Sequence, residues 1–268
     1  MRTRTIVQPL ACLGMLLSSA ASAAVLPSEA VAGERVLLAT TICQGGSPTD
    51  LSAPPRLAIE NGALHLRAQV YLGGFAVASC LRMHILSDPV PAGTYDALFS
   101  YEVTNNPARP TIGPERLGTL TVAPQDVPAA PLHRRLSGNW FDPAAPGTGV
   151  NLVQGQSGAL FAAWLTHPPL DILDYSSFAN GTQTLAFGGW YVMSEGRWIS
   201  PTVFRGPLFA TRGQSSERVW DAAMLAVEPM GFASFTFVGP EEVRFEATLL
   251  YGYGKQLTTA QTLRRFGF

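Results

Sequence analysis

The sequence contains few charged residues and no long apolar segment. Asp, Glu, Lys and Arg make up 14% of the 268 residues, the net charge is −1 at neutral pH, and Lys255 is the only lysine. A chain with so few basic residues offers no evident surface for the phosphates of a nucleic acid. Beyond the first 24 residues, no stretch is apolar and long enough to cross a membrane as a helix. We therefore predict a protein that binds no nucleic acid and whose mature chain has no transmembrane segment.

Motifs for catalysis and metal binding are also missing. The four histidines lack the spacing of metal ligands: His65, His84, His133 and His167. Gln156-Ser157-Gly158 lacks the G-x-S-x-G pattern of a nucleophilic serine, and residues 252–255 lack most of a phosphate-binding P-loop. We predict no catalytic residue, no metal site and no cofactor, and the sequence leaves enzymatic activity open.

The first residues have the order of a secretory signal peptide. Arg2 and Arg4 precede a short apolar run over residues 5–17, and small residues follow up to Ala23. A charged start, a short apolar middle and an A-x-A end are typical of such a peptide. A membrane anchor is the alternative, but the run is well short of the roughly 20 residues that a spanning helix needs. We predict that residues 1–23 are removed by cleavage after Ala23 and that the protein is periplasmic or secreted.

Two of the three cysteines remain after this cleavage, Cys43 and Cys80. An exported chain enters an oxidising compartment, so we predict a disulfide bond between them. In the chain-entropy model, closing this loop of about 37 residues stabilises the fold by roughly 3–4 kcal/mol. A pair of buried thiols is the alternative.

Alternating apolar residues predict a β-sandwich over residues 24–122. Residues 63–72 and 95–103 have the period of two that is typical of half-buried strands. Shorter apolar runs lie at residues 34–40, 81–86 and 117–122, and turn-forming residues such as glycine, proline and asparagine separate the runs. The segment Pro91-Ala92-Gly93-Thr94-Tyr95 resembles a turn and strand of bacterial immunoglobulin-like modules. We predict an all-β fold that begins with an immunoglobulin-like β-sandwich.

A second domain follows a Pro-rich linker. Residues 123–136 contain three prolines and no periodicity, which predicts the linker. All five tryptophans and 21 of the 26 aromatic residues lie in residues 137–268. Eight or nine successive strands with short turns, residues 198–204 and 218–227 among them, predict an antiparallel up-and-down β-barrel there. Closure into a barrel removes exposed sheet edges. The clearest strand is 243–251, with Val243, Phe245, Ala247, Leu249 and Tyr251 inward and Leu250 among the outward residues.

The motif G-x-W occurs three times: Gly138-Asn139-Trp140, Gly188-Gly189-Trp190 and Gly196-Arg197-Trp198. The first of them resembles the start of lipocalins and avidins, whose first strand bends at the glycine and whose tryptophan closes one end of a barrel. This resemblance implies structural roles for Gly138 and Trp140. It also implies that Arg264 or Arg265 packs on the Trp140 ring, a cation–π contact of about 1 kcal/mol.

A longer pattern resembles a family of secreted proteobacterial proteins of unknown function. It covers residues 136–268 and consists of G-x-W-[FY]-[DN]-P, G-x-G, a W-[FLY]-[ST]-[FYH] strand, a further G-x-W and a G-x-[LI]-[FY] strand. Its segments are Gly138–Pro143, Gly147–Gly149, Trp164–His167, Gly189–Tyr191 and Gly206–Phe209. The resemblance implies export and an all-β fold, and it implies no activity.

The aromatic residues supply the candidate ligand site. Adjacent strand residues point to opposite faces, so we expect one of Trp190 and Tyr191 to be exposed. With Trp164 and Trp198 they are the ligand-binding candidates, because exposed aromatic rings stack on sugars or contact protein partners. We predict an exported, non-catalytic binding or interaction protein whose ligand is a glycan or an envelope protein.

An alternative function is hydrolysis of cell-envelope polymers. It requires two carboxylates in the mouth of the barrel, such as Asp142 and Glu195. Glycosidases hold their two carboxyl groups about 5–10 Å apart across the sugar. The separation of these two side chains therefore distinguishes the two functions.

Overall fold

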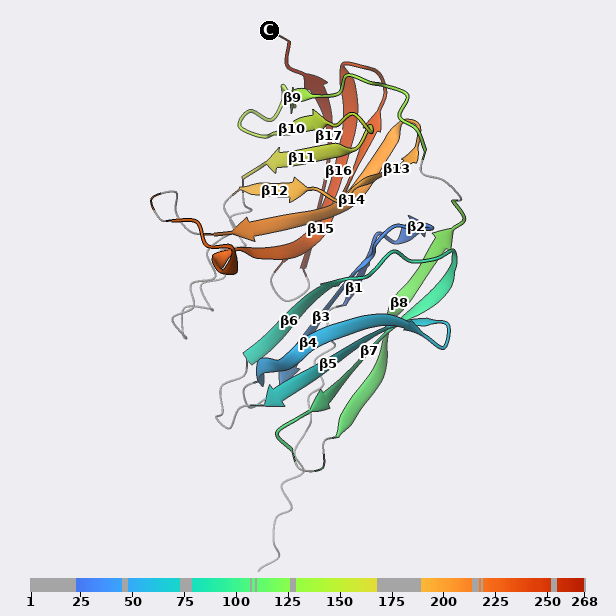
Figure 1. Ribbon diagram of the computed structural model, residues 1–268, viewed down its shortest axis with the longest axis vertical. Helices are drawn as coiled ribbons and strands as arrows, with labels where there is room; N and C mark the ends of the chain where they lie inside the picture. The colour runs from blue at the N-terminus through green and yellow to red at the C-terminus, as the bar shows by residue number, and fades with distance from the viewer. Residues whose placement is uncertain are drawn as a thin grey trace, which may run out of the picture.

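The computed structural model has an all-β fold, as predicted, with a barrel above two smaller sheets in the view of Figure 1. It describes residues 23–44, 48–72, 79–106, 108, 110–125, 129–167, 189–213, 217, 219–251 and 255–267. The predicted signal peptide lies outside the described residues, apart from Ala23. In the described part of the chain, none of the helices has the length and apolar character that crossing a membrane requires.

The second half of the chain forms the barrel. Its elements are β9 (Gly138–Phe141), β10 (Gly149–Gln154), β11 (Leu160–Leu165), β12 (Trp190–Met193), β13 (Arg197–Ser200), β14 (Val203–Arg212), the 3-10 helix η3 (Ala222–Met224), β15 (Ala226–Phe237), β16 (Glu242–Tyr251) and β17 (Lys255–Arg265). Each strand pairs antiparallel with the next along the chain, except that β12 pairs with β14 and not with β13. Pairing of β17 with β9 and of β12 with β14 closes a ring of eight strands, and β13 lies beside β14. The predicted up-and-down antiparallel barrel is therefore confirmed.

Aromatic side chains fill the inside of the barrel. The strands alternate as predicted, so β16 points Val243, Phe245 and Ala247 into the core. The rings of Phe235 and Phe245 lie 5.0 Å apart between centroids, and Trp164 meets Phe245 edge-on at 5.2 Å. Large rings dominate the burial of apolar surface in such a core. This accounts for the concentration of aromatic residues after residue 137.

Two predicted barrel strands have different bounds. Residues 198–204 divide into β13 and β14, with a turn at Pro201, because proline cannot donate a hydrogen bond to a continuous ladder. Residues 218–227, predicted as a strand, instead contain η3, and β15 begins only at Ala226. The Asp221 side chain caps η3 by accepting a hydrogen bond from the Ala223 amide (2.9 Å).

The first half of the chain forms two sheets around one core. Its strands are β1 (Ala24–Leu26), β2 (Glu29–Val31), β3 (Leu37–Gln44), β4 (Pro48–Glu60), β5 (Ala63–Leu72), β6 (Ser79–Leu86), β7 (Gly93–Val103) and β8 (Thr111–Ala123). The sheet orders are β1-β3-β6 and β2-β8-β7-β5-β4, with parallel pairing of β2 with β8 and of β5 with β7. The shared core includes Leu38 from one sheet and Leu66 and Phe99 from the other. The immunoglobulin-like arrangement of these sheets stays a prediction.

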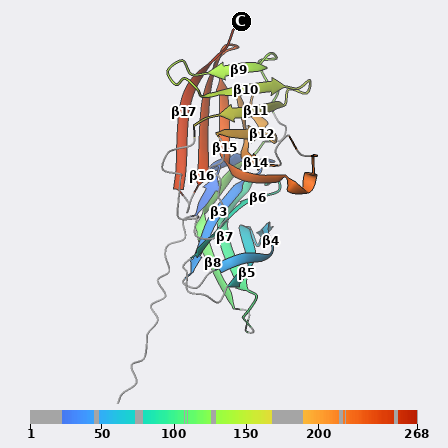
Figure 2. The ribbon, with the colours of Figure 1, turned by 90° about the vertical axis from the view of Figure 1, so that its left-hand side faces the viewer.

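The small sheet β1-β3-β6 lies between the larger sheet and the barrel (Figures 1 and 2). In β3, Leu38 points into the core between the two sheets of the first half, and Leu37 packs with Phe232 and Leu250 of the barrel. A strand covered on both faces needs apolar residues on both, which explains its continuous buried run. Leu250, predicted to point outward, does so but is 0% exposed because this sheet covers it.

Polar contacts reinforce the same interface. The Glu34 carboxylate is 3% exposed and accepts hydrogen bonds from both Arg205 Nε (2.9 Å) and Arg205 Nη2 (2.5 Å). Arg35 pairs with Glu195 across the interface, and Arg197 donates to the Ala32 carbonyl (2.9 Å). The two halves therefore pack as one unit.

The predicted linker also contacts the barrel. The Ala129 amide donates to the Trp198 carbonyl (3.2 Å) and the Leu132 amide to the Pro201 carbonyl (2.8 Å), while Leu136 is fully buried in the barrel core. The described residues of this segment form no helix or strand between β8 and β9, as expected from its prolines. These contacts hold residues 129–136 against one end of the barrel.

A candidate anion-binding pocket at one end of the barrel

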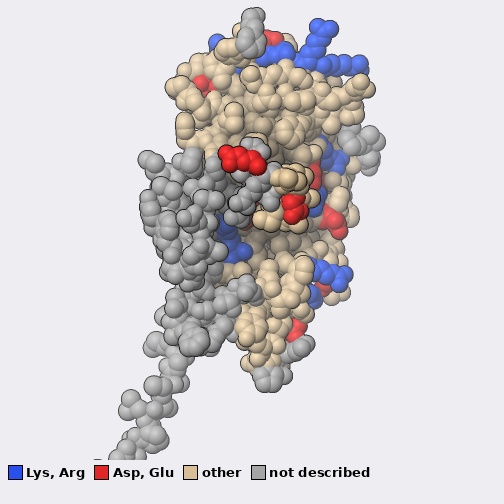
Figure 3. Space-filling view, turned by 60° about the vertical axis from the view of Figure 1, so that its left-hand side comes forward, with Lys and Arg blue, Asp and Glu red and all other residues tan. Residues whose placement is uncertain are grey.

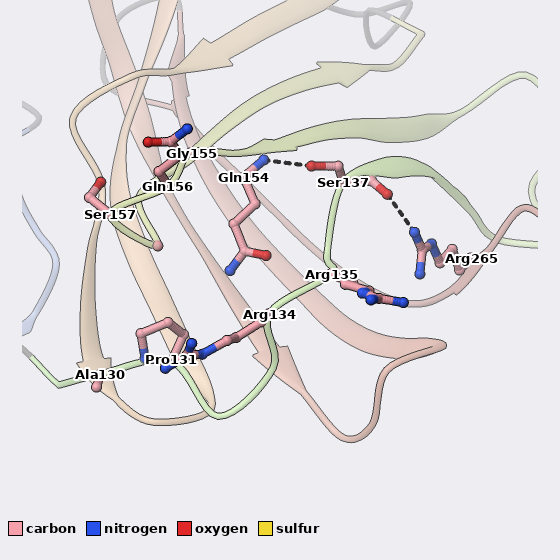
Figure 4. Close-up of a pocket in the computed structure, with 11 residues that line it drawn as sticks. Ala130, Pro131, Arg134, Arg135, Ser137, Gln154, Gly155, Gln156, Ser157 and Arg265 are labelled. Atoms are coloured by element: carbon pink, nitrogen blue, oxygen red, sulfur yellow. Dashed lines mark hydrogen bonds between the residues drawn. The ribbon is translucent and has the colours of Figure 1, made fainter.

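A pocket of about 690 Å³ lies where residues 129–136, predicted to be a linker, cross the end of the barrel (Figure 4). Three parts of the chain line it. They are residues 130–137, the turn 154–158 between β10 and β11, and Arg265 near the end of β17. The closing pair β17–β9 brings Arg265 beside this segment, although 128 positions separate Arg265 from Ser137. The pocket is therefore a consequence of barrel closure.

Two buried tryptophans hydrogen-bond the backbone of the segments that form the pocket. Trp140 Nε1 donates to the Leu136 carbonyl (3.1 Å), and Trp198 Nε1 donates to the Gly158 carbonyl (2.7 Å). Both rings contact Phe237, with centroid distances of 6.0 and 5.6 Å. A buried indole N–H needs an acceptor, so each bond fixes one wall segment on the aromatic core. Trp140 is thus buried and bonded at this end of the barrel, and its role in closing the barrel stays a prediction.

Gln154 fixes the conformation of the basic segment. Its Nε2 donates to the His133 carbonyl (3.1 Å), and its Oε1 accepts from the Leu136 amide (3.1 Å). The backbone N–H of Gln154 donates to Ser137 Oγ (2.8 Å), as Figure 4 shows. Arg134 and Arg135 lie between these anchored positions, so their backbone is held without using either guanidinium.

Three arginines carry the charge of the pocket. Arg265 donates to the Ser137 carbonyl (2.7 Å) and lies 3.6 Å from the Glu241 carboxylate. Arg134 and Arg135 are exposed, and neither forms an ion pair with any residue that the structure describes. No Asp or Glu is among the described residues that line the pocket. Its field is therefore positive in a chain that is nearly neutral overall.

This arrangement suits oxyanions. A guanidinium presents a planar set of donors that matches carboxylate, sulfate or phosphate oxygens. Exposed Gln156 and Ser157 add neutral groups that hydrogen-bond hydroxyls. The volume lies within the range of pockets that enclose small organic ligands. The described lining contains no paired nucleophile and base.

The structure separates the aromatic ligand candidates. Trp190 is 49% exposed while its neighbour Tyr191 is buried, which confirms that one of the two faces solvent. Burial raises the pKa of the Tyr191 hydroxyl. Trp164 and Trp198 are also buried, and both belong to the barrel core with Tyr191. Of the four ligand-binding candidates, Trp190 alone keeps the exposure that stacking on a ligand requires.

The expected arginine–tryptophan contact takes another form. Arg265 lies directly opposite Trp140 in the β17–β9 register, but its guanidinium bonds the Ser137 carbonyl. Arg264 faces solvent, and Gly138 adopts a φ of +142°, which favours glycine at the start of β9. The described contacts include no cation–π pair between Trp140 and either arginine. The predicted cation–π contact is therefore wrong for the described residues.

The two carboxylates of the hydrolase alternative lie at opposite ends of the barrel. The register places Phe141 level with Trp190, and Gly138 level with Met193. Asp142 follows Phe141 at one end, and Glu195 follows Met193 at the other. Three residues of strand, about 10 Å, separate these two levels, and three inter-strand spacings of about 4.8 Å lie between β9 and β12. Asp142 accepts from the Ala144 amide (2.8 Å) in a turn, and Glu195 pairs with Arg35.

Among the described residues, no group of three or more His, Cys, Asp or Glu side chains is placed to hold a metal ion.

Scans against protein families, curated proteins and solved structures find no match. The motif resemblances to secreted proteobacterial proteins, lipocalins and avidins therefore stay predictions.

Sequence reasoning missed Arg134, Arg135 and Gln154, although one signal was present. The chain contains only two Arg-Arg pairs, Arg134-Arg135 and Arg264-Arg265. The fold brings both pairs to this end of the barrel.

Proposed function

We propose that this protein is an exported, non-catalytic binding protein whose barrel-end pocket holds a ligand with acidic oxygen groups. One observation carries the proposal. The pocket is lined by guanidinium groups from two segments that are distant in the sequence. Arg134 and Arg135 come from one segment and Arg265 from the other, and the described lining residues include no carboxylate. Clustering like charges is unfavourable for the folded chain, and an anionic ligand relieves this cost.

Export is the part of the proposal that rests on the sequence. The signal peptide and the Cys43–Cys80 disulfide are both proposed, and both cysteine side chains lie outside the described residues. The backbone register of β3 and β6 supports the disulfide, because it pairs Cys43 directly with Cys80. Opposite residues in antiparallel strands have Cα atoms about 4.5–5.5 Å apart, within the range that a disulfide spans. A disulfide would be consistent with a periplasmic or secreted protein.

The hydrolase alternative has less support. Asp142 and Glu195 are separated by the length of the barrel strands and are engaged in a turn and an ion pair. This geometry differs from a carboxylate pair that faces across one sugar.

Titration calorimetry tests the proposal. Galacturonate oligomers are titrated into the purified protein, with uncharged galactose oligomers as ligand controls. We expect heat from the acidic series only. Arg135→Gln is expected to weaken binding by about 10-fold or more, since a charge-assisted hydrogen bond contributes about 1.5–3 kcal/mol.

Arg116→Gln is the matched control, because Arg116 is exposed and pairs with Asp96 in the first half of the chain. It is expected to bind like the wild-type protein. If no acidic ligand among uronates, sulfates and phosphates binds, or if both variants lose affinity equally, the pocket is not the site.

A second observation favours an additional contact with a glycan or protein partner. Exposed apolar residues are paired across three strands, Val153 with Phe161 and Leu165 with Trp190. Figure 3 shows few charged side chains on the barrel face over these strands. The two pairs lie four residues apart on β11, and exposed apolar groups of this kind are typical of interaction surfaces. A glycan array probed with wild-type protein and Trp190→Ala tests it, and equal signals from both would remove Trp190 from the contact.

A further inference from the structure

The charged groups of the pocket are divided between two sides. In Figure 4 the Arg134 side chain extends toward Pro131, whereas the Arg135 side chain extends the other way, toward Arg265. The two neighbours therefore serve different parts of one cavity. A single small anion would contact one side and leave the other unoccupied.

The two sides also differ in available charge. Arg265 already bonds the Ser137 carbonyl and lies near Glu241, so its charge is partly compensated. Arg135 supplies the uncompensated charge on that side, and Arg134 supplies it on the other. Each side can thus take one acidic group.

Neutral hydrogen-bonding groups lie on the turn that forms the facing wall. Gln156 and Ser157 are exposed there. Amides and hydroxyls of this kind suit sugar hydroxyls. The described lining contains no Trp, Tyr or Phe on which a nucleobase would stack, so nucleotides fit the pocket less well.

The size of the pocket agrees with an extended ligand. Its volume of about 690 Å³ is within the range that encloses drug-sized molecules and is more than one inorganic anion fills. The ligand should therefore have acidic groups that are joined by a hydroxyl-rich spacer.

We propose that the pocket binds an acidic polysaccharide through two successive acid-bearing sugars, one on Arg134 and the other on Arg135 with Arg265. This inference rests on the proposed function, because it names the ligand class of the same site. Binding of two linked groups gains affinity over one, since the second contact is intramolecular. A ligand with two linked acidic sugars should therefore bind more tightly than one with a single acidic sugar, which binding of a single anion does not predict.

The test compares galacturonate monomer, dimer and tetramer on the full mature protein by titration calorimetry. We expect the dimer to bind at least about 10-fold more tightly than the monomer. Arg134→Gln should remove most of the dimer's advantage and leave monomer binding nearly unchanged. Arg135→Gln should weaken both ligands. Arg116→Gln should leave the whole series unchanged, and circular dichroism confirms that each variant is folded.

The outcomes separate the two proposals. Equal affinity for monomer and dimer would overturn the two-sugar inference while the proposed function stands. Binding of tripolyphosphate without binding of uronate or sulfated oligosaccharides would likewise overturn the two-sugar inference and keep an anion-binding pocket. If no acidic ligand binds, the proposed function fails, and this inference fails with it.

Discussion

Replacing Arg205 by methionine is expected to destabilise the protein through the interface between its two halves. Arg205 in β14 is the bidentate donor to Glu34, whose side chain is 3% exposed, while the Arg205 side chain is 18% exposed. The methionine side chain replaces the apolar stem but removes the charge, so Glu34 remains buried without its cation. Breaking a buried pair in this way costs about 3–5 kcal/mol. Because Arg205 is partly exposed, we expect a loss of about 3 kcal/mol.

Urea unfolding followed by tryptophan fluorescence and by circular dichroism measures this loss. The matched control is Arg244→Met, which removes the Arg244–Glu246 pair on the outside of the same barrel, where both side chains are well exposed. An exposed pair contributes about 0–1 kcal/mol. The double variant Arg205→Met with Glu34→Gln should recover part of the stability, because it also removes the buried carboxylate.

A loss from Arg205→Met no larger than that from Arg244→Met would refute the reasoning. It would mean that Glu34 is hydrated in solution and that the two halves of the chain separate. The same conclusion would follow if the double variant were less stable than the Arg205→Met variant.

Three further predictions concern stability. Burial first, and then Arg82, lowers the pKa of His84 to about 4, so the folded state takes up this proton at a lower pH than the unfolded state. The free energy of unfolding should therefore decrease by about 3 kcal/mol from about pH 6.5 to pH 4. Urea unfolding over this pH range should show a smaller decrease for His84→Gln than for the wild-type protein. Leu250→Ala should cost about 2–4 kcal/mol in the same assay, whereas a cost below 1 kcal/mol would contradict a covered Leu250. Trp198→Phe should cost about 1–3 kcal/mol by leaving the Gly158 carbonyl without its donor, and an unchanged thermal midpoint would argue against this bond.

Periodicity predicted the strands that have one solvent-facing and one buried face. Residues 63–72 form β5, and residues 243–251 form nearly all of β16, because alternation records a single buried face. β4 was missed because Pro54 and Pro55 obscure its pattern. It lies at the edge of its sheet and has register shifts, where proline is tolerated.

The packing of the two halves was not predictable from each half alone. Leu250 on the outward face of β16 was an exception to the alternation, and its burial under β3 explains it. Residues 123–136 were predicted to be a linker because their prolines exclude regular structure. Their backbone hydrogen bonds to the barrel depend on tertiary contacts that periodicity does not encode.

The candidate site shows the same limit. Trp190 was identified because adjacent strand residues alternate, although the pattern did not say which of Trp190 and Tyr191 is exposed. The arginine pocket depends on the closing pair β17–β9, which brings Arg265 to the residues before β9. Such a long-range contact follows from the barrel order and from no local pattern.

The central claim is that the barrel-end pocket binds an acidic ligand through Arg134 and Arg135. Its most direct test is the calorimetric titration of tetragalacturonate into the wild-type protein and into the double variant Arg134→Gln/Arg135→Gln at one salt concentration. We predict saturable one-site binding to the wild-type protein and a loss of at least about 100-fold in the double variant, since each arginine contributes a charge-assisted contact. Equal affinity in a folded double variant, or no binding to the wild-type protein, would contradict it.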